Sequence, residues 1–388
     1  MEKYLIFTEE EYRARARKLQ ALMAKNGLDG AIFTKGANLI YFTGYDTSLY
    51  NSDFRPFFAV FPAAGEPTLI VPNLELGGAR KTSWVEDIRI WGGTKGCAST
   101  DPILLLRDVV VEKGLDKSRV GMELSNGQRL GMTVAQFRAM QKELPAMEIA
   151  DNECVVWPVR MVKSPAEIEY LRKACYANDR GFEAAVEAIR DGATEKEVEI
   201  AMAKAMIEHG AHPDFMTITA GLNRYDMCNP RACERVVMRK GDMVVMDFGC
   251  RYEHYYADVT RGVFVGEPHP RAAALYRAVE EVNHAALEAA KPGNPVKEID
   301  AAAEKKITEL GYRDLMMHRT GHSLGVEVHE QPSIGPAETA ILEEGMVLAI
   351  EPGLYDFSVG GFRIEDNIVI TKTGFEYLTK ASRDIIVR

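Results

Sequence analysis

Long hydrophobic runs and clusters of basic residues are both missing from this 388-residue chain. No stretch of about 18 consecutive apolar residues occurs, so the sequence predicts no membrane-spanning helix. The N-terminal segment MEKYLIFTEEEYRARARK carries charge at nearly every turn and does not resemble a signal peptide. Lys and Arg total 47 against 57 Asp and Glu, a net charge of −10 without any basic stripe. This balance argues against nucleic acid as a partner.

Cysteine is sparse, and no Cys-x-x-Cys pair occurs. Such spacing is typical of reduced thiols and argues against a disulfide framework. We therefore expect a cytoplasmic protein with free cysteines. The six are Cys97, Cys154, Cys175, Cys228, Cys233 and Cys250.

Residues 1–158 are predicted to form an α/β domain. Thr8 and Glu11 have the spacing of a capping box, and an amphipathic helix is expected to follow to about Asn26. Apolar runs separated by helical patterns indicate buried strands in a covered sheet. The expected strands are Gly30–Phe33, Leu39–Phe42, Phe57–Phe61, Thr68–Val71, Val120–Met122 and Met147–Ile149.

Residues 159–388 are predicted to form an α+β domain with a repeated order of elements. Helix-start signals at Ser164 and Thr194 open two helices, the first running to about Ile189 and the second stopping at Gly210. Two strands, Met243–Asp247 and Tyr255–Val265, are expected to follow. The same order then recurs with helices Arg271–Ala290 and Pro295–Leu310 and strands Met346–Glu351 and Phe362–Ile370. This duplication predicts two halves around a pseudo-twofold axis, with four carboxylates converging between them.

Those four carboxylates and one histidine form a candidate metal site. Asp247 and Glu351 each end an apolar strand, where an acid is costly to bury unless it is paired or bound to a cation. Asp258, Glu365 and His322 complete the set, and glycines on either side of His322 suit a tight loop. A single strand-end acid is more often a helix cap or an ion-pair partner. The joint pattern is what indicates metal binding.

The chemistry of these five groups favours two divalent ions. Four carboxylates and one imidazole are mostly hard oxygen ligands, which favour Mn²⁺, Co²⁺ or Fe²⁺ and differ from the thiolate ligands of a typical zinc site. Zn²⁺ stays open as an alternative. Four negative charges nearly balance two divalent ions, and one bridging hydroxide completes the arrangement used in two-metal hydrolysis.

The motifs that carry these residues resemble the pita-bread metallohydrolase family, which includes prolidase, aminopeptidase P, methionine aminopeptidase and creatinase. The spacings of 11, 64, 29 and 14 residues (247 to 258, 258 to 322, 322 to 351 and 351 to 365) are similar to those of prolidases. The resemblance implies a creatinase/prolidase-type N-terminal domain and a pita-bread catalytic domain. The matching segments are MDFG (246–249), YADVTRG (256–262), HRTGHSLGVEVHE (318–330), EEGMVLAIEPGLY (343–355) and GGFRIEDNIVIT (360–371).

The resemblance also implies roles for individual residues. Asp247, Asp258, His322, Glu351 and Glu365 would bind the two metals, and Glu351 would also act as general base on a water molecule. His329 would stabilise the tetrahedral oxyanion. For Arg363, two roles stay open: holding a substrate carboxylate or orienting Glu365. His318 is a substrate-side candidate whose expected role is packing or support of the loop.

One segment departs from the proline-specific pattern. Such enzymes carry a histidine in the loop before the first Asp strand, and here no histidine lies between His212 and His254. Cys228 or Asn229 falls near the expected place, which puts ordinary Xaa-Pro peptidase activity in doubt. Asp53-Phe54-Arg55-Pro56 partly resembles a creatinase stretch whose arginine reaches across the dimer to the substrate carboxylate. Arg55 is therefore a further substrate-binding candidate.

Three functions follow from these patterns. The leading expectation is a dinuclear-metal hydrolase that cleaves a C–N bond in a small carboxylate-bearing substrate, of the Xaa-Pro dipeptidase or aminopeptidase type. The alternative is a non-peptidase of the same fold, either a creatinase-like hydrolase of a small zwitterion or a lyase. A non-catalytic binding module is the third, and the complete ligand set argues against it. The resemblance further implies a homodimer.

Overall fold

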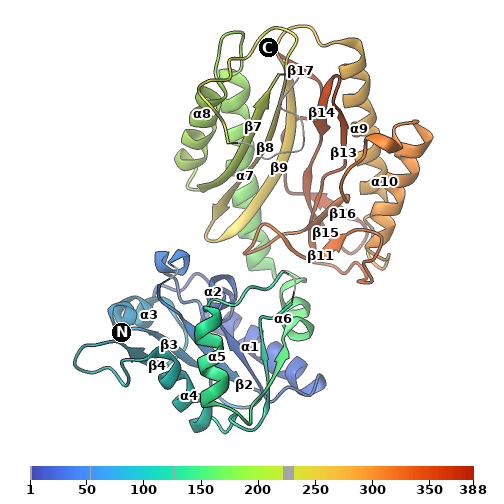
Figure 1. The fold of residues 1–388 in the computed structure, drawn as a ribbon. Helices are drawn as coiled ribbons and strands as arrows, with labels where there is room; N and C mark the ends of the chain where they lie inside the picture. Colours follow the sequence, from blue (N-terminus) through green and yellow to red (C-terminus); the bar gives the residue numbers. More distant parts are fainter. Residues whose placement is uncertain (1, 53, 126, 222–230) are drawn as a thin grey trace. The chain divides into compact units, whose positions relative to one another are not determined.

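The computed structural model of the chain describes residues 2–52, 54–125, 127–221 and 231–388 (Figure 1). The chain divides into two compact units, residues 1–160 and 161–388. The boundary predicted at 158/159 falls inside the last helix of the first unit, α6 (Glu153–Arg160). Within the described residues, no helix has the length and apolar character that crossing a bilayer requires.

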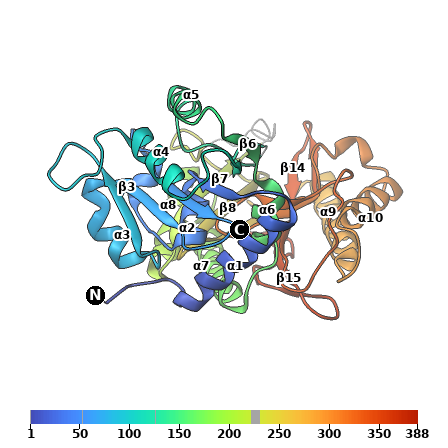
Figure 2. The ribbon, with the colours of Figure 1, turned by 90° about the horizontal axis from the view of Figure 1, so that it is seen from below.

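The N-terminal unit is a mixed sheet covered by helices, as the α/β prediction requires. Its six strands run in the order β4-β3-β2-β1-β5-β6, with β1 antiparallel to β2 and parallel to β5. Helices α4 and α5 cover one face, and α1 lies on the other (Figure 2). The strands are β1 (Gly30–Phe33), β2 (Phe58–Pro62), β3 (Thr68–Pro72), β4 (Asp87–Trp91), β5 (Arg119–Met122) and β6 (Glu148–Asp151). Besides α6, the helices are α1 (Glu9–Lys25), α2 (Gly36–Thr43), α3 (Leu76–Thr82), α4 (Pro102–Glu112) and α5 (Val134–Glu143).

One predicted strand of this unit is wrong. Leu39–Phe42 lies in helix α2, because a short apolar run does not distinguish a buried strand from a buried helix. The buried carboxylate of Glu123 accepts the backbone N–H groups of Thr34 and Lys35, directly before the helix. Gly44, at φ 72°, ends the helix in the left-handed conformation that glycine adopts at low cost.

The C-terminal unit contains two antiparallel-rich sheets flanked by two pairs of helices. Figure 1 shows α7 and α8 on one side of the strands and α9 and α10 on the other. The sheets have the orders β17-β9-β8-β7 and β11-β10-β12-β15-β16, and β13 pairs with β14. The helices are α7 (Pro165–Ala188), α8 (Glu195–Glu208), α9 (Pro270–Ala289) and α10 (Lys297–Glu309). The strands are β7 (His212–Ala220), β8 (Met243–Tyr252), β9 (Tyr255–Phe264), β10 (Gly321–Ser323), β11 (Glu330–Ile334), β12 (Val347–Ile350), β13 (Gly353–Asp356), β14 (Gly360–Arg363), β15 (Asp366–Ile370), β16 (Phe375–Tyr377) and β17 (Ile386–Val387).

The repeated order of elements is present, and each half has more strands than the sequence predicted. Strands β7, β8 and β9 are antiparallel neighbours in the first half, and β10, β12 and β15 are antiparallel neighbours in the second, which also contains β11, β13, β14 and β16. The single strand predicted over Phe362–Ile370 is divided into β14 and β15, with Ile364 and Glu365 between them. This break places Glu365 at a junction where its backbone is free to turn toward β9.

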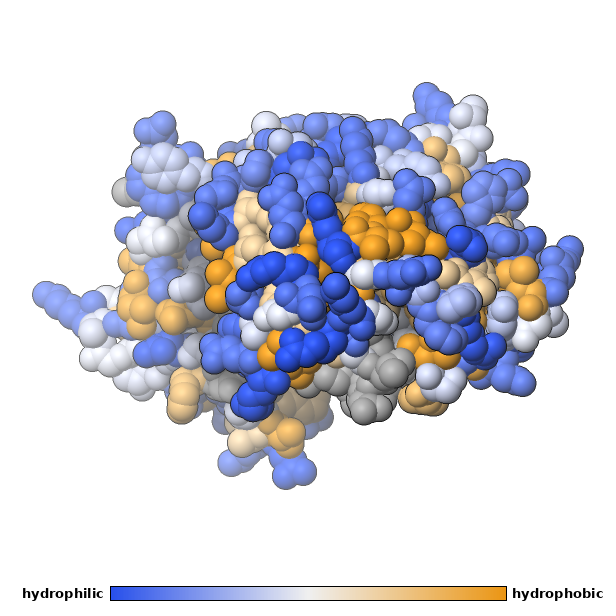
Figure 3. All heavy atoms as spheres, turned by 90° about the horizontal axis from the view of Figure 1, so that it is seen from above, coloured by the Kyte–Doolittle hydropathy of each residue, from blue (hydrophilic) through white to orange (hydrophobic). Residues whose placement is uncertain are grey.

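The face drawn in Figure 3 is largely polar. On the face drawn in Figure 3, hydrophilic side chains predominate, and hydrophobic ones gather in small groups between them. Exposed apolar side chains of this kind are normal on a globular protein. One apolar core cluster of the C-terminal unit lies between α9, α10 and the β12–β15 strands, and it includes Leu275, Val279, Ile307, Leu348 and Ile368.

Candidate metal centre

Strands β8 and β9 place two of the predicted ligands on one face. In the antiparallel pairing, Asp247 lies opposite Thr260, and Asp258 lies opposite Gly249. Directly paired residues share a face, and so do residues two apart along a strand. Asp247, Thr260 and Asp258 therefore project from the same side of the sheet.

The second sheet supplies the other three predicted ligands. His322 in β10 lies opposite Ala349 in β12, so Glu351, two residues beyond Ala349, continues on the face of His322. The backbone N–H of Glu351 donates to the carbonyl of Thr320 (2.7 Å). The backbone N–H of Glu365 donates to the carbonyl of Thr260 (3.1 Å), which joins the two sheets beside the carboxylates.

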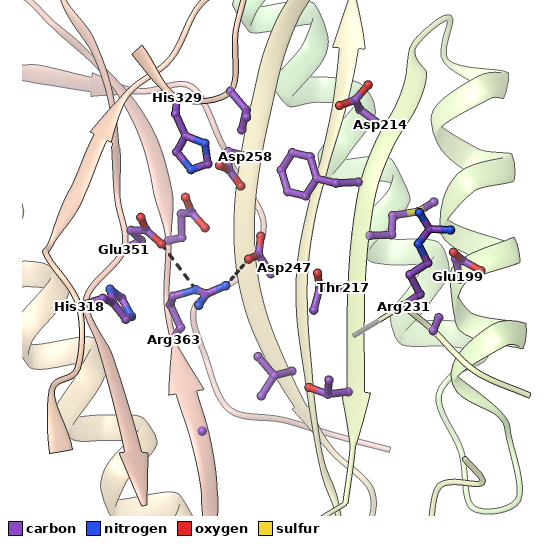
Figure 4. Close-up of a pocket in the computed structure, with 18 of the residues that line it drawn as sticks. Glu199, Asp214, Thr217, Arg231, Asp247, Asp258, His318, His329, Glu351 and Arg363 are labelled. Atoms are coloured by element: carbon purple, nitrogen blue, oxygen red, sulfur yellow. Dashed lines mark hydrogen bonds and ion pairs between the residues drawn. The ribbon is translucent and has the colours of Figure 1, made fainter. Parts of the chain in front are cut away.

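All five side chains meet in one cluster. Ligand-type atoms of Asp247, Asp258 and Glu365 lie within 4.8 Å of one another, as do those of His322, Glu351 and Glu365. A third group within the same limit joins Asp258 and His322 to His329. Of these side chains, Figure 4 labels Asp247, Asp258, Glu351 and His329 and shows them directed toward a common space. The spatial convergence expected from the sequence is present, and His329 lies beside it.

The electrostatics of this cluster fit a bound cation. Burial and the neighbouring carboxylates raise the pKa of Asp258 and of Glu365 well above their usual ranges, and burial raises the pKa of Glu351 to about 7. Among the described residues, neither Asp258 Oδ1 nor Glu365 Oε1 has a hydrogen-bond partner. Buried carboxylate oxygens are normally paired or bound to a metal. The donor set therefore fits divalent metal ions.

His322 is held in the state that a metal ligand needs. Its Nδ1 lies 3.0 Å from the carbonyl oxygen of Ser323, which fixes the proton there and leaves Nε2 with its lone pair. Nε2 lies 3.5 Å from Glu351 Oε1 and 3.6 Å from Asp258 Oδ2. Burial, followed by the neighbouring His329, lowers the pKa of His322 to about 3, so the imidazole is neutral at pH 7.

Each nitrogen of the Arg363 guanidinium contacts another group of the protein. Its Nε donates to Thr260 Oγ1 (2.8 Å), one terminal nitrogen donates to the Tyr355 hydroxyl (2.9 Å), and the other pairs with Asp247. Its Nε also lies 3.8 Å from Glu351 Oε2. The sequence left open whether Arg363 holds a substrate carboxylate or orients Glu365. This geometry favours the second role only indirectly, because Arg363 pairs with Asp247 and reaches Glu365 through Thr260.

The remaining predicted site residues lie at different places. His329 is exposed at the pocket, with its ring centroid 4.3 Å from that of His322. His318 is half-buried, its Nε2 lies 2.8 Å from the Tyr355 hydroxyl, and burial lowers its pKa to about 4. Arg55 is exposed in the N-terminal unit. Cys228 lies outside the described residues.

Thr260 is a site residue that the sequence analysis missed. Its hydroxyl donates to Glu365 Oε2 (2.7 Å) and accepts from Arg363, so one side chain orients two of the site residues. Asn367 also orients a site residue, because its amide accepts from the N–H of Asp258 (2.9 Å) and donates to the carbonyl of Asp258 (2.7 Å). The alternation Asp258-Val259-Thr260 indicated that Thr260 shares the face of Asp258, but its partners come from distant strands.

Replacing Thr260 by Val is expected to weaken metal binding or turnover by about 10–100-fold, the usual cost of losing a group that orients a metal ligand. Val keeps the volume of this buried side chain but leaves Glu365 Oε2 and Arg363 Nε without their shared partner. Isothermal titration with Mn²⁺ and steady-state kinetics measure the two quantities. Thr260→Ser, which retains the hydroxyl, serves as the control and should stay near wild type. Equal values for the Val and Ser variants would contradict the assigned role.

The cluster forms one wall of a pocket of about 930 Å³. The opposite wall is built from α8, β7 and the residues after the undescribed segment, including Glu199, Asp214 and Arg231 (Figure 4). Phe215 and Val328 supply apolar lining close to the charged groups. The pocket therefore offers a substrate both a charged centre and apolar contact surface, the usual composition of a small-molecule site.

Comparison with known proteins gives matches to both units. Residues 169–372 match metallopeptidase family M24, and residues 15–162 match the creatinase/prolidase N-terminal domain. An Xaa-Pro dipeptidase of Pyrococcus furiosus is 34% identical over 96% of this chain and 100% of its own length. An Xaa-Pro dipeptidase of Lactobacillus delbrueckii subsp. lactis is 32% identical over 95% and 98%. The crystal structure of the prolidase from Pyrococcus horikoshii OT3 has a TM-score of 0.83 and 32% identity, covering 96% of this chain and 100% of that one.

Proposed function

The chain belongs to metallopeptidase family M24, whose members are metal-dependent hydrolases, and from that premise we propose that it hydrolyses Xaa-Pro dipeptides. The observation that carries this proposal is the meeting of Asp247, Asp258, His322, Glu351 and Glu365 in one buried cluster beside His329. Relatives that match over nearly their whole length are Xaa-Pro dipeptidases, which supports the choice of substrate within the family.

The family implies divalent metal ions, and we propose two, with Mn²⁺ or Co²⁺ preferred and Fe²⁺ or Zn²⁺ possible. Asp247, Asp258 and Glu365 would hold one ion, and His322, Glu351 and Glu365 the other, with Glu365 common to both groups. The oxygen-rich donor set supports the preference for Mn²⁺ and Co²⁺. When bound, such ions supply Lewis acidity, which lowers the pKa of water and polarises a carbonyl group.

The protein groups around the cluster support a hydrolytic reaction. Glu351, whose carboxylate lies 3.5 Å from His322 Nε2 in the cluster, takes a proton from the attacking water. Although His329 is exposed at the pocket, partial desolvation of its ring, followed by the nearby Arg319, lowers its pKa, so its neutral imidazole donates an N–H bond to the oxyanion that forms at the scissile carbon. Arg363 stays paired with Asp247 and fixes the direction of that carboxylate.

The leaving group also fits these residues. The amide nitrogen of an Xaa-Pro bond carries no hydrogen, so no backbone donor is available for the enzyme to recognise there. That nitrogen must gain a proton as the C–N bond breaks, and the proton that Glu351 has taken from water is the one returned to it. Because Glu351 acts first as base and then as acid, the reaction requires no second titrating group beside the leaving nitrogen.

Arg55 and the oligomeric state belong to the same proposal. We propose that the protein is a homodimer, as the family resemblance implies. We also propose Arg55 as a candidate for contact with the substrate carboxylate. Gel filtration with light scattering measures the oligomeric state. An Arg55→Gln variant with a raised KM for Ala-Pro and an unchanged kcat would support contact between Arg55 and the substrate carboxylate.

The experiment that tests the function combines metal removal with a substrate panel. The enzyme stripped with a chelator is expected to lose essentially all hydrolysis of Ala-Pro and Gly-Pro and to regain it with Mn²⁺ or Co²⁺. Ala-Ala, creatine and the tripeptide Ala-Pro-Gly serve as comparison substrates. Activity that survives exhaustive chelation would overturn the metal-dependent mechanism. Hydrolysis of creatine in preference to both prolyl dipeptides would overturn the proposed substrate.

A further inference from the structure

A buried lysine lies directly behind the wall that carries the two pocket histidines. The side chain of Lys163 is 1% exposed, and its ammonium lies 3.3 Å from Glu330 Oε2, whose side chain is also 1% exposed. The same ammonium donates to Ser323 Oγ (3.1 Å). A buried ion pair of this kind is weak evidence for stability, because desolvation of both charges opposes their attraction. Its position therefore calls for another explanation.

Besides its longer contact with the Met161 carbonyl (3.5 Å), the Lys163 ammonium meets Ser323 and Glu330, and each of these two is the chain neighbour of a pocket histidine. Ser323 follows His322 in β10, and Glu330 follows His329 at the start of β11. Adjacent residues of a strand point to opposite faces, so when His322 faces the pocket, Ser323 faces away from it. The carbonyl of Ser323 is also the group that fixes the Nδ1 proton of His322. Lys163 thus contacts Ser323 and Glu330, the residues that follow the two histidines in the chain.

The turn between the histidines is built around the Glu330 carboxylate. Its Oε1 accepts from the backbone N–H of Glu327 (3.2 Å). A Cβ atom at Gly325 would lie 2.7 Å from Glu330 Oε1, so only glycine allows the backbone to approach this carboxylate so closely. The backbone of Lys163 is itself fixed, since its N–H donates to the carbonyl of Gly345 (3.0 Å), just before β12.

We propose that Lys163 is a positioning residue that, through Ser323 and Glu330, sets the placement of His322 and His329 relative to each other. This inference rests on the proposed function for the roles of the two histidines and adds the group that aligns them. It predicts that the two contacts of Lys163 have different effects. The contact with Ser323 positions His322 and therefore affects metal affinity, whereas the contact with Glu330 positions His329 and therefore affects the rate of the chemical step.

Three variants separate the effects of these two contacts. Ser323→Ala is expected to weaken the binding of Mn²⁺ to the metal-free protein by about 10-fold or more, measured by calorimetry. Glu330→Gln is expected to lower kcat for Ala-Pro by about 10–100-fold at saturating Mn²⁺ with metal affinity within about 3-fold of wild type. The double variant Lys163→Met/Glu330→Gln removes both charges without leaving one buried and unpaired, and it is expected to show both defects.

Ile307→Ala in α10 is the matched control for a loss of stability alone. Ile307 is 1% exposed in the apolar core and has no polar contact, so its variant should melt earlier but keep the wild-type metal affinity and kcat. Variants of Ser323, Glu330 and Lys163 that only melt earlier, like this control, would overturn the inference. A wild-type enzyme that cleaves no prolyl dipeptide would instead overturn the proposed function, and the metal titration of Ser323→Ala would still test the positioning role.

Discussion

Glu351→Gln is expected to lower kcat for Ala-Pro by about 10²–10⁴-fold, the contribution that a positioned general base typically makes. The amide has nearly the shape of the carboxylate and keeps an oxygen near His322 Nε2, but it cannot accept a proton from water at neutral pH. KM should stay within a few-fold of wild type, because the substrate contacts of the pocket remain. Steady-state kinetics at saturating Mn²⁺ measures both parameters.

Two further measurements make this result specific. Glu344, seven residues earlier in the chain, is exposed, and Glu344→Gln is expected to leave kcat unchanged. Metal content per protein separates the loss of the base from the loss of a ligand, since a variant that keeps its metal but loses turnover has lost the proton acceptor. Near-full activity of Glu351→Gln with bound metal would exclude Glu351 as the base.

Two of the ligands, Asp247 and Glu351, were predictable from their local sequence because an acid conflicts with its apolar surroundings, whereas Asp258, His322 and Glu365 were identified only from the joint pattern. Asp247 and Glu351 follow apolar runs that bury the backbone on both sides, and an unpaired acid there is costly. That conflict is visible without knowledge of the fold. The position of Glu365 was less well predicted: the strand assigned to Phe362–Ile370 is broken at this residue, and the break lets it reach Thr260.

The supporting residues were not predictable because their roles depend on pairing between distant strands. Lys163 and Glu330 are far apart in the chain, and nothing in either local pattern shows that they meet behind the histidines. Thr260 is an ordinary strand residue until β9 is placed beside the junction of β14 and β15. Strand β10 was missed because its three residues are too few to show any periodicity. Local patterns therefore identified charged groups that needed a partner, whereas tertiary pairing determined what holds them.

The same conflict leads to a stability prediction for Asp258→Asn. In the metal-free protein, Asp258 is 4% exposed and lies among Glu365, Asp247 and Glu351, which together with burial raise its pKa. Removing its charge is expected to raise the free energy of unfolding of the metal-free C-terminal unit by about 1–3 kcal/mol at pH 8. The same change should abolish stabilisation by Mn²⁺, which for wild type is about 2.7 kcal/mol at 100 times Kd. Calorimetric unfolding with and without Mn²⁺ measures both effects.

The pH dependence of this effect identifies its cause. A carboxyl group whose folded pKa is raised favours folding fully below its unfolded value of about 3.9, and that contribution is lost as pH rises through the folded value. Metal-free wild type should therefore lose stability between about pH 4 and pH 8, a range that includes the pKa of about 7 of Glu351. Asp258→Asn should match wild type at pH 4 and exceed it at pH 8, whereas the exposed control Asp314→Asn should match it at both. An Asp258→Asn protein less stable than wild type at pH 8 without metal would show that the carboxylates do not repel one another in the folded state, and the case for a cation between them would fail.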